Sequence, residues 1–245
     1  MKAGILCLFL CWMFSPALRA DPAPGSFEAA NRLYEEGKFA EASASYEQLV
    51  QAGRVSPALY FNLGNAWFKS GQMGRAIAAY RHAEQLAPRD PDVRANLQFA
   101  RNQVQGPTLP ASPWRRWLGQ LSLNEWSALA AVAFWALFLL LAAKQWRPAL
   151  KPSLRTPTLV SAAAALLLVA CLAVSLFQVR SFRLAVVIKP EAIVRYGWLD
   201  VSQTNFSVHD GAELQILDQN NDWFQVTAGP LRIGWIRRDQ VLLVH

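Results

Sequence analysis

The chain has 245 residues, 53% of them apolar and 17% charged, and this composition excludes an ordinary pair of soluble domains because part of the apolar content must lie in lipid. The net charge of +7 is unevenly distributed: residues 21–106 carry nine basic and nine acidic side chains, residues 184–245 carry five and seven, and residues 107–183 carry eight basic side chains against Glu125 alone. Since the excess flanks apolar segments, the charge argues against a phosphate-binding surface, and no nucleic-acid partner is expected.

Residues 1–20 are expected to form a signal peptide. Lys2 precedes an apolar run of signal-peptide length, Pro16 interrupts it, and the small residue Ala20 marks the expected cleavage site. Leu18 is larger than the ideal residue two places earlier, so an uncleaved anchor is the alternative. In both cases the basic end stays in the cytoplasm and the following segment is exported.

An internal repeat with a constant period follows. The matching pairs are Phe27 and Phe61, Asn31 and Asn65, Gly37 and Gly71, Ala42 and Ala76, and Tyr46 and Tyr80, and the two members of every pair are separated by the same interval. The glycines suit a turn, the alanines permit close helix approach, and the tyrosines suit a core between repeats. The spacing therefore predicts two helix-turn-helix units.

Together with Leu63-Gly64, Trp67 and Pro88, these pairs resemble the tetratricopeptide repeat (TPR), a family of helical hairpins that bind proteins and that share this period. Arg54 stands where Pro88 recurs, and Pro57 is expected to break the helix instead. A further helix begins at Asp90-Pro91, lacks the turn glycine and is expected to cap the stack. The predicted TPR domain covers residues 21–105, with repeats at about 27–56 and 57–90 and the capping helix at 91–105.

Two membrane spans are predicted after a Pro-rich linker. Trp126 to Ala143 holds no charged residue over 18 positions and Thr158 to Val179 holds none over 22, which is enough for a hydrocarbon core of about 30 Å. The loop between them carries four cations and no anion, which places it in the cytoplasm and both flanking domains outside. The predicted segments are the linker and interface segment 106–122, spans 123–143 and 158–179, and the basic loop 144–157.

From Leu184 to His245 the pattern becomes alternating and β-branched, which predicts a small all-β module. Its turns are expected at His209-Asp210-Gly211, Gln219-Asn220-Asn221-Asp222 and Ala228-Gly229-Pro230. The stretches VHDGAELQILDQNNDWFQV and IGWIRRDQVLLV resemble the bacterial SH3-like domain. The expected fold is therefore that of a multidomain membrane protein: an all-α TPR repeat domain, a two-helix transmembrane hairpin and a small all-β SH3-like barrel.

No short signature of catalysis, cofactor binding or metal binding occurs in the sequence. His82, His209 and His245 are isolated from any acid or cysteine at ligand spacing, and GxSxG, P-loop and HExxH patterns are absent. Cys171, the one cysteine beyond the signal segment, lies in an apolar span. We therefore expect no catalytic site, no metal, no cofactor and no enzymatic activity.

Resemblance to the TPR family implies a groove lined by the first helix of each repeat. The candidate partner-binding residues are Asn31, Tyr34, Phe61, Asn62, Asn65, Phe68 and Lys69, with Phe27, Asp92, Asn96 and Phe99 as further groove residues. Aromatic residues at helical spacing are more often core than ligand platforms. Asn31 and Asn65 are better candidates, because asparagine is a poor mid-helix residue whose recurrence suggests a hydrogen bond to a bound peptide or to a neighbouring turn.

A carboxylate clamp for a chaperone tail is not expected. Phe27 occupies the place of the first clamp lysine, and Asp92 and Asn96 replace the remaining basic residues of that motif. In the β module, Trp198, Phe206, Trp223, Phe224 and Trp235 fit either a peptide groove or a small core, and the core is favoured for Trp223 and Trp235.

The order of parts resembles the BatE-like family, the TPR members of the aerotolerance operon. This resemblance implies an inner-membrane scaffold that works beside von Willebrand factor A-domain membrane proteins and other Bat-type components, including a MoxR-type ATPase, in envelope or stress functions. The alternative, from another class, is a tether that binds peptidoglycan stem peptides through the SH3-like domain.

Overall fold

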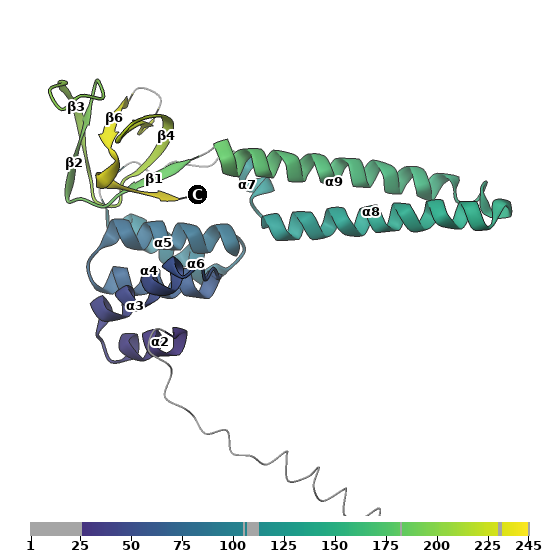
Figure 1. The fold of residues 1–245 in the computed structure, drawn as a ribbon, viewed down its shortest axis with the longest axis horizontal. Coiled ribbons are helices and arrows are strands. Elements are labelled where there is room, and N and C mark those ends of the chain that lie inside the picture. The colour runs from purple at the N-terminus through teal and green to yellow at the C-terminus, as the bar shows by residue number, and fades with distance from the viewer. Residues whose placement is uncertain (1–25, 105, 107–112, 182, 230–231, 245) are drawn as a thin grey trace, which may run out of the picture.

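The computed structural model of the chain describes residues 26–104, 106, 113–181, 183–229 and 232–244. Figure 1 shows three parts: a stack of helices at the N-terminal side, a long helical hairpin, and a small β domain next to the helical stack. The predicted signal peptide at residues 1–20 lies outside the described residues.

Five helices form the N-terminal stack, in agreement with two predicted helix-turn-helix repeats followed by one further helix. They are α2 (Phe27–Glu35), α3 (Phe39–Gln51), α4 (Pro57–Lys69), α5 (Met73–Leu86) and α6 (Pro91–Asn102). Gly37 and Gly71 take positive φ angles of 76° and 75° at the turns within the repeats, a conformation that glycine adopts without strain. Pro57 opens α4 rather than ending α3, after Ser56 has capped the helix by accepting the Leu59 N–H at 3.1 Å.

A pair of long apolar helices forms the hairpin between the stack and the β domain. Short α7 (Pro113–Leu118) leads into α8 (Leu123–Trp146), and a 3-10 turn at Pro148–Leu150 leads into α9 (Arg155–Ser181). Both α8 and α9 are long and apolar enough to cross a membrane. Only 11% and 6% of their most apolar windows are buried, so most of this apolar surface faces outward, as it would in lipid.

The C-terminal part is one seven-stranded antiparallel sheet in the order β3-β2-β6-β5-β4-β1-β7. The strands are β1 (Leu184–Val187), β2 (Glu191–Arg195), β3 (Thr204–His209), β4 (Glu213–Asn220), β5 (Trp223–Thr227), β6 (Ile233–Arg237) and β7 (Val241–Val244). The prediction of an all-β module is confirmed. Strand β3 has the weakest sequence pattern of the seven, because TNFSVH is polar and only Val208 on it is fully buried.

The β domain packs directly against the helical stack, which the sequence analysis did not anticipate. All four residues of β1 are buried. Ala185 and Val187 belong to the core of the sheet, whereas Leu184 and Val186 share a second core with residues of α5 and α6. Because side chains alternate along a strand, β1 is buried on both faces and joins the two domains into one body.

A buried ion cluster crosses this interface. Glu213 of β4, with a side chain only 1% exposed, accepts hydrogen bonds from Arg81 of α5 at 2.8 and 2.9 Å and from Arg101 of α6 at 2.9 Å. Glu84 pairs with Arg81 from the same helix at 3.0 Å, so two carboxylates balance two guanidinium groups. Burial raises the pKa of the Glu213 carboxyl, but Arg81 and Arg101 outweigh it and hold this pKa below its ordinary value.

The N-terminus of α5 meets the β domain at a point of close backbone approach. The α5 cap residue, Gln72, makes no side-chain cap hydrogen bond, and Asp210 of the β domain instead accepts the Gly74 N–H at 3.1 Å. Burial raises the pKa of Asp210 above its ordinary value, although backbone N–H groups of α5 counteract the shift. A Cβ at Gly74 would lie 2.0 Å from the Val187 carbonyl oxygen, so only glycine permits this contact.

Replacing Gly74 by alanine tests the docking. In an isolated helix this change would stabilise α5 by about 1 kcal/mol, so any loosening must come from the clash with Val187. We expect faster amide hydrogen exchange in β1 and β7 of Gly74→Ala, measured on the detergent-solubilised full chain. The exposed Gln72→Ala is the matched control, and unchanged exchange in Gly74→Ala would contradict the described interface.

Replacing Glu213 by glutamine tests the ion cluster. At neutral pH we expect Glu213→Gln to destabilise the docked body by about 3 kcal/mol, because both arginines lose their buried carboxylate. A carboxyl whose folded pKa is lowered stabilises the folded state above its unfolded pKa, and this contribution disappears as pH falls through the lowered folded value. Thermal unfolding followed by tryptophan fluorescence should therefore show the difference from the wild type shrinking below about pH 4. Glu191→Gln, at an exposed glutamate of β2, should change little at any pH.

Candidate functional site

A hydrogen-bonded ladder links the repeats through their recurring asparagines and tyrosines. In the first repeat the Tyr46 hydroxyl donates to Asn31 Oδ1 at 2.6 Å, and Asn62 Nδ2 donates to the same oxygen at 3.1 Å. The asparagine thus joins both helices of its own repeat to the first helix of the next. The predicted hydrogen bond of Asn31 exists, and its partners are side chains of neighbouring helices.

The same arrangement recurs one repeat later. The Tyr80 hydroxyl donates to Asn65 Oδ1 at 2.7 Å, and Asn96 Nδ2 donates to it at 2.9 Å. Asn96 follows Asn62 by the same interval that separates Asn31 from Asn65, so α6 continues the repeat as the first helix of a third unit.

Burial keeps the tyrosines of the ladder protonated. It raises the pKa of Tyr46 to about 12, and it also raises the pKa of Tyr80 above the ordinary value. Both hydroxyls therefore remain hydrogen-bond donors at any physiological pH. The asparagine oxygens are fixed in place as the acceptors of the ladder.

A hollow of about 260 Å³ opens beside the second rung of this ladder. It is lined by Tyr34, Asn65, Phe68, Lys69, Tyr80, Asn96 and Phe99. Phe68 and Phe99 stand with ring centroids 5.6 Å apart, and the Phe99 side chain is 55% exposed. Lys69 is the only cation among the lining residues. The hollow thus combines an aromatic wall, amide groups and one positive charge.

The structure brings part of the predicted binding set together. Four of the seven candidates line the hollow: Tyr34, Asn65, Phe68 and Lys69. Asn31 and Asn62 bond to each other one repeat earlier. Phe61 is partly buried, with its ring centroid 6.1 Å from that of Tyr80, in the core that α5 shares with β1.

Of the further groove residues expected from the sequence, Asn96 and Phe99 line the hollow, whereas Phe27 and Asp92 do not. Tyr80 is the one lining residue that is not among the expected groove residues. Tyr80 was interpreted as core, and it is indeed buried, with only its edge reaching the hollow. Phe99 follows Asn65 by one full period, so it occupies the asparagine position of the third unit.

In the β domain, Trp223, Phe224 and Trp235 are buried, with exposures of 8%, 1% and 7%, as favoured for the two tryptophans. Trp198 is half exposed and packs edge-on against Trp235, with ring centroids 5.4 Å apart. Among the described residues, no group of three or more histidine, cysteine, aspartate or glutamate side chains is placed to hold a metal ion.

Comparison with known protein families supports the assignment of the helical stack to tetratricopeptide repeats. A model of the tetratricopeptide repeat family matches residues 27–91, which confirms the two predicted repeats. The matched region reaches only the first residue of α6 and leaves the hairpin and β domain outside. No curated protein matches the chain. TPR repeats indicate protein–protein interaction as the role of this part of the molecule.

Substitution of Asn65 tests whether the asparagine is primarily structural. Asn65→Ala should destabilise the protein by about 1–3 kcal/mol, because Tyr80 and Asn96 both lose an acceptor in a part-buried environment. Thermal unfolding of the full chain in detergent provides the measurement. Asn102→Ala, at an exposed position whose side chain bonds to Gln98, should have a much smaller effect. Equal effects of the two changes would contradict the structural role.

Proposed function

We propose that the protein is a non-enzymatic membrane scaffold whose TPR groove binds an extended segment of a partner protein. The observation that carries this proposal is the hollow between Phe68, Lys69 and Phe99, beside an asparagine ladder that holds the helices at fixed separation. A rigid, preformed groove binds with less ordering cost than a surface that must first assemble.

The lining of the hollow indicates the kind of segment that would fit. Phe68 and Phe99 offer an aromatic wall for an apolar side chain, and Lys69 offers a charge for an acidic neighbour. The absence of further cations from this lining argues for one acidic contact rather than a multiply charged tail. The preferred partner segment is therefore apolar with a flanking aspartate or glutamate.

We further infer a place in the inner membrane, with the TPR domain and the β domain both on the extracytoplasmic side. The two domains pack against each other, so they must share one side of the membrane. They lie at one end of the hairpin, whereas the turn with Lys144, Arg147 and Lys151 lies at the other (Figure 1). Cationic loops favour the cytoplasmic side, which supports this orientation.

We assign the β domain to the bacterial SH3-like class and the whole chain to the BatE-like family on the order of its parts. The partners proposed on this basis are von Willebrand factor A-domain membrane proteins and other Bat-type components of an envelope or stress complex. Anchoring by α8 and α9 would hold a captured partner close to the bilayer and so raise its effective concentration there.

Site-specific photocrosslinking in intact membranes tests the groove. A photoreactive residue at the exposed position 99 should trap exported or membrane-bound proteins, and Lys69→Glu should reduce that yield at least fivefold by reversing the charge of the lining. Neither position contributes to the buried ladder, so the fold should be preserved.

A photoreactive residue at position 55 is the control, because Val55 is 62% exposed and does not line the hollow. The same proteins trapped equally at both positions, or a yield at position 99 unaffected by Lys69→Glu, would count against the groove as the binding site.

A further inference from the structure

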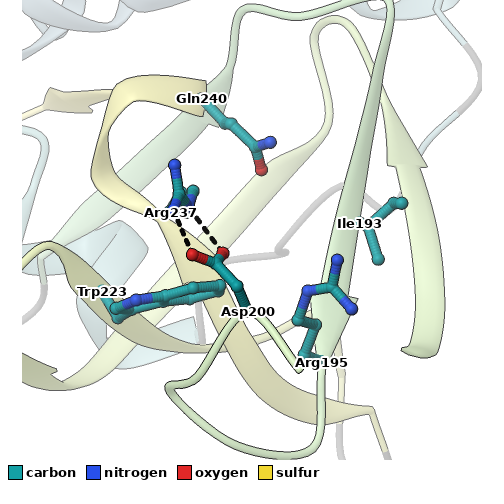
Figure 2. A pocket seen from close by; sticks show the side chains of 6 residues that line it. All are labelled: Ile193, Arg195, Asp200, Trp223, Arg237 and Gln240. Carbon is teal, nitrogen blue, oxygen red and sulfur yellow. Dashed lines mark hydrogen bonds and ion pairs between the residues drawn. The ribbon is translucent and has the colours of Figure 1, made fainter. Parts of the chain in front are cut away.

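A second hollow, of about 320 Å³, lies in the β domain away from the helical stack. Ile193 and Arg195 of β2, Asp200 of the following loop, Trp223 of β5, Arg237 of β6 and Gln240 line it. Figure 2 shows the Arg237 and Asp200 side chains meeting beside the Trp223 ring, with Arg195 and Ile193 across the space and Gln240 at its far end. The contacts with the helical stack come from β1, β7 and Glu213 of β4, whereas the residues that line this hollow come from β2, β5, β6 and the segments next to them.

The hollow carries an excess of positive charge with unused hydrogen-bond donors. Arg237 uses Nε and Nη2 on Asp200, at 3.0 and 2.5 Å, and Arg195 uses Nη1 on the Ser202 carbonyl oxygen at 2.8 Å. A guanidinium group has five N–H donors, so each arginine keeps donors for a further acceptor. Among the lining residues, two guanidinium groups face one carboxylate, while Asp222 and Asp239 act on Arg237 from outside the lining. The guanidinium groups and their unused donors suit an anionic ligand.

The ion pair between Arg237 and Asp200 leaves Arg237 accessible to a ligand. Arg237 and Asp200 have side chains 47% and 63% exposed, and ion pairs at such exposure contribute little to stability. A second carboxylate can therefore share Arg237 without a large loss. The Arg237 guanidinium also lies beside Trp223, 5.6 Å from the ring centroid.

Gln240 adds a hydrogen-bond acceptor to the lining of the hollow. Its Oε1 is enclosed and accepts no hydrogen bond from the described residues. Because Oε1 has no hydrogen bond to lose, rotation of the Gln240 side chain toward the hollow can bring this oxygen to a ligand N–H. The lining thus offers donors for a carboxylate and an acceptor for an N–H group, the two polar groups of the last residue of a polypeptide.

We propose that this hollow binds the free C-terminal carboxylate of a partner protein whose last residues are apolar. Arg195 and Arg237 bind the carboxylate, Gln240 accepts the terminal amide N–H, and Ile193 and Trp223 contact the last side chain.

The surroundings of the hollow favour a protein tail over a small or polar peptide. The loop that carries Asp200 also exposes Tyr196, Trp198, Leu199 and Val201, with exposures from 49% to 91%. Such a group of large apolar side chains on one loop is typical of a protein-binding surface. It would cover the apolar residues that precede the carboxylate, whereas a wall stem peptide offers it little to contact.

The first experiment is selection from a random heptapeptide library displayed with free C-termini, against the full chain in detergent. The selected consensus is then synthesised as a free acid and as a C-terminal amide, and both are titrated calorimetrically. We expect apolar final residues and at least tenfold tighter binding of the acid. Arg195→Gln and Arg237→Gln should each lower the affinity for the free-acid peptide at least tenfold. The matched control is Arg238→Gln, at the next arginine, which does not line the hollow.

Several outcomes would overturn the assignment. The first is that no peptide is selected, and the second is that the free acid and the amide bind equally well. The third is that the free acid binds the Arg195 and Arg237 variants as tightly as the wild type. Binding of purified muropeptides that depends on Arg195, with no selected tail, would assign the hollow to the cell wall instead. Retention of tail binding in Phe99→Ala would separate this site from the TPR groove, and loss of binding there would contradict a site in the β domain.

Discussion

The burial of β1 on both faces is the constraint on which the rest of the architecture depends. Ala185 and Val187 complete the core of the sheet, and Leu184 and Val186 complete the core of the helical stack. A repeat stack that ended at α6 would leave one side of α5 uncovered, because α6 is only the first helix of a third unit. Strands β1 and β7 occupy the place that the second helix of that unit would take.

This docking also determines how the α8–α9 hairpin is placed within the chain. The chain leaves the stack after α6, passes through α8 and α9, and returns at β1 to the same interface. Arg89, just before α6, forms an exposed ion pair with Glu125 in the first turn of α8, so the start of the hairpin lies next to the stack. The helical stack and the β domain therefore form one body that is interrupted in the chain by the α8–α9 hairpin.

The local features of this protein were predictable from sequence, and the contacts between distant segments were not. The constant period identified the repeats because each helix packs on its sequence neighbours. The interface joins segments far apart in the chain, such as those of Arg81 and Glu213, and no local pattern pairs them. One signal was nonetheless present: Ile77 stands one period after Ser43, so the second repeat has an apolar side chain where the first has a hydroxyl. The hydrogen bonds of Asn31 and Asn65 were predicted, but their partners on neighbouring helices were not, because helical spacing does not show which side chains meet across the repeats.

Both hollows lie on the same docked body, so their separation is fixed and one partner could bind both. The TPR hollow lies on the α4–α6 side and the arginine-lined hollow lies on β2 and β6, while Glu213 and Asp210 fix the orientation between them. Two weak sites at a fixed separation bind a single partner more tightly than either site alone, provided the partner spans both. If the interface opened, the two sites would reorient independently and this gain would be lost. Buried charges at the interface favour one relative orientation over others, because any shifted arrangement leaves Arg81, Arg101 or Glu213 unpaired.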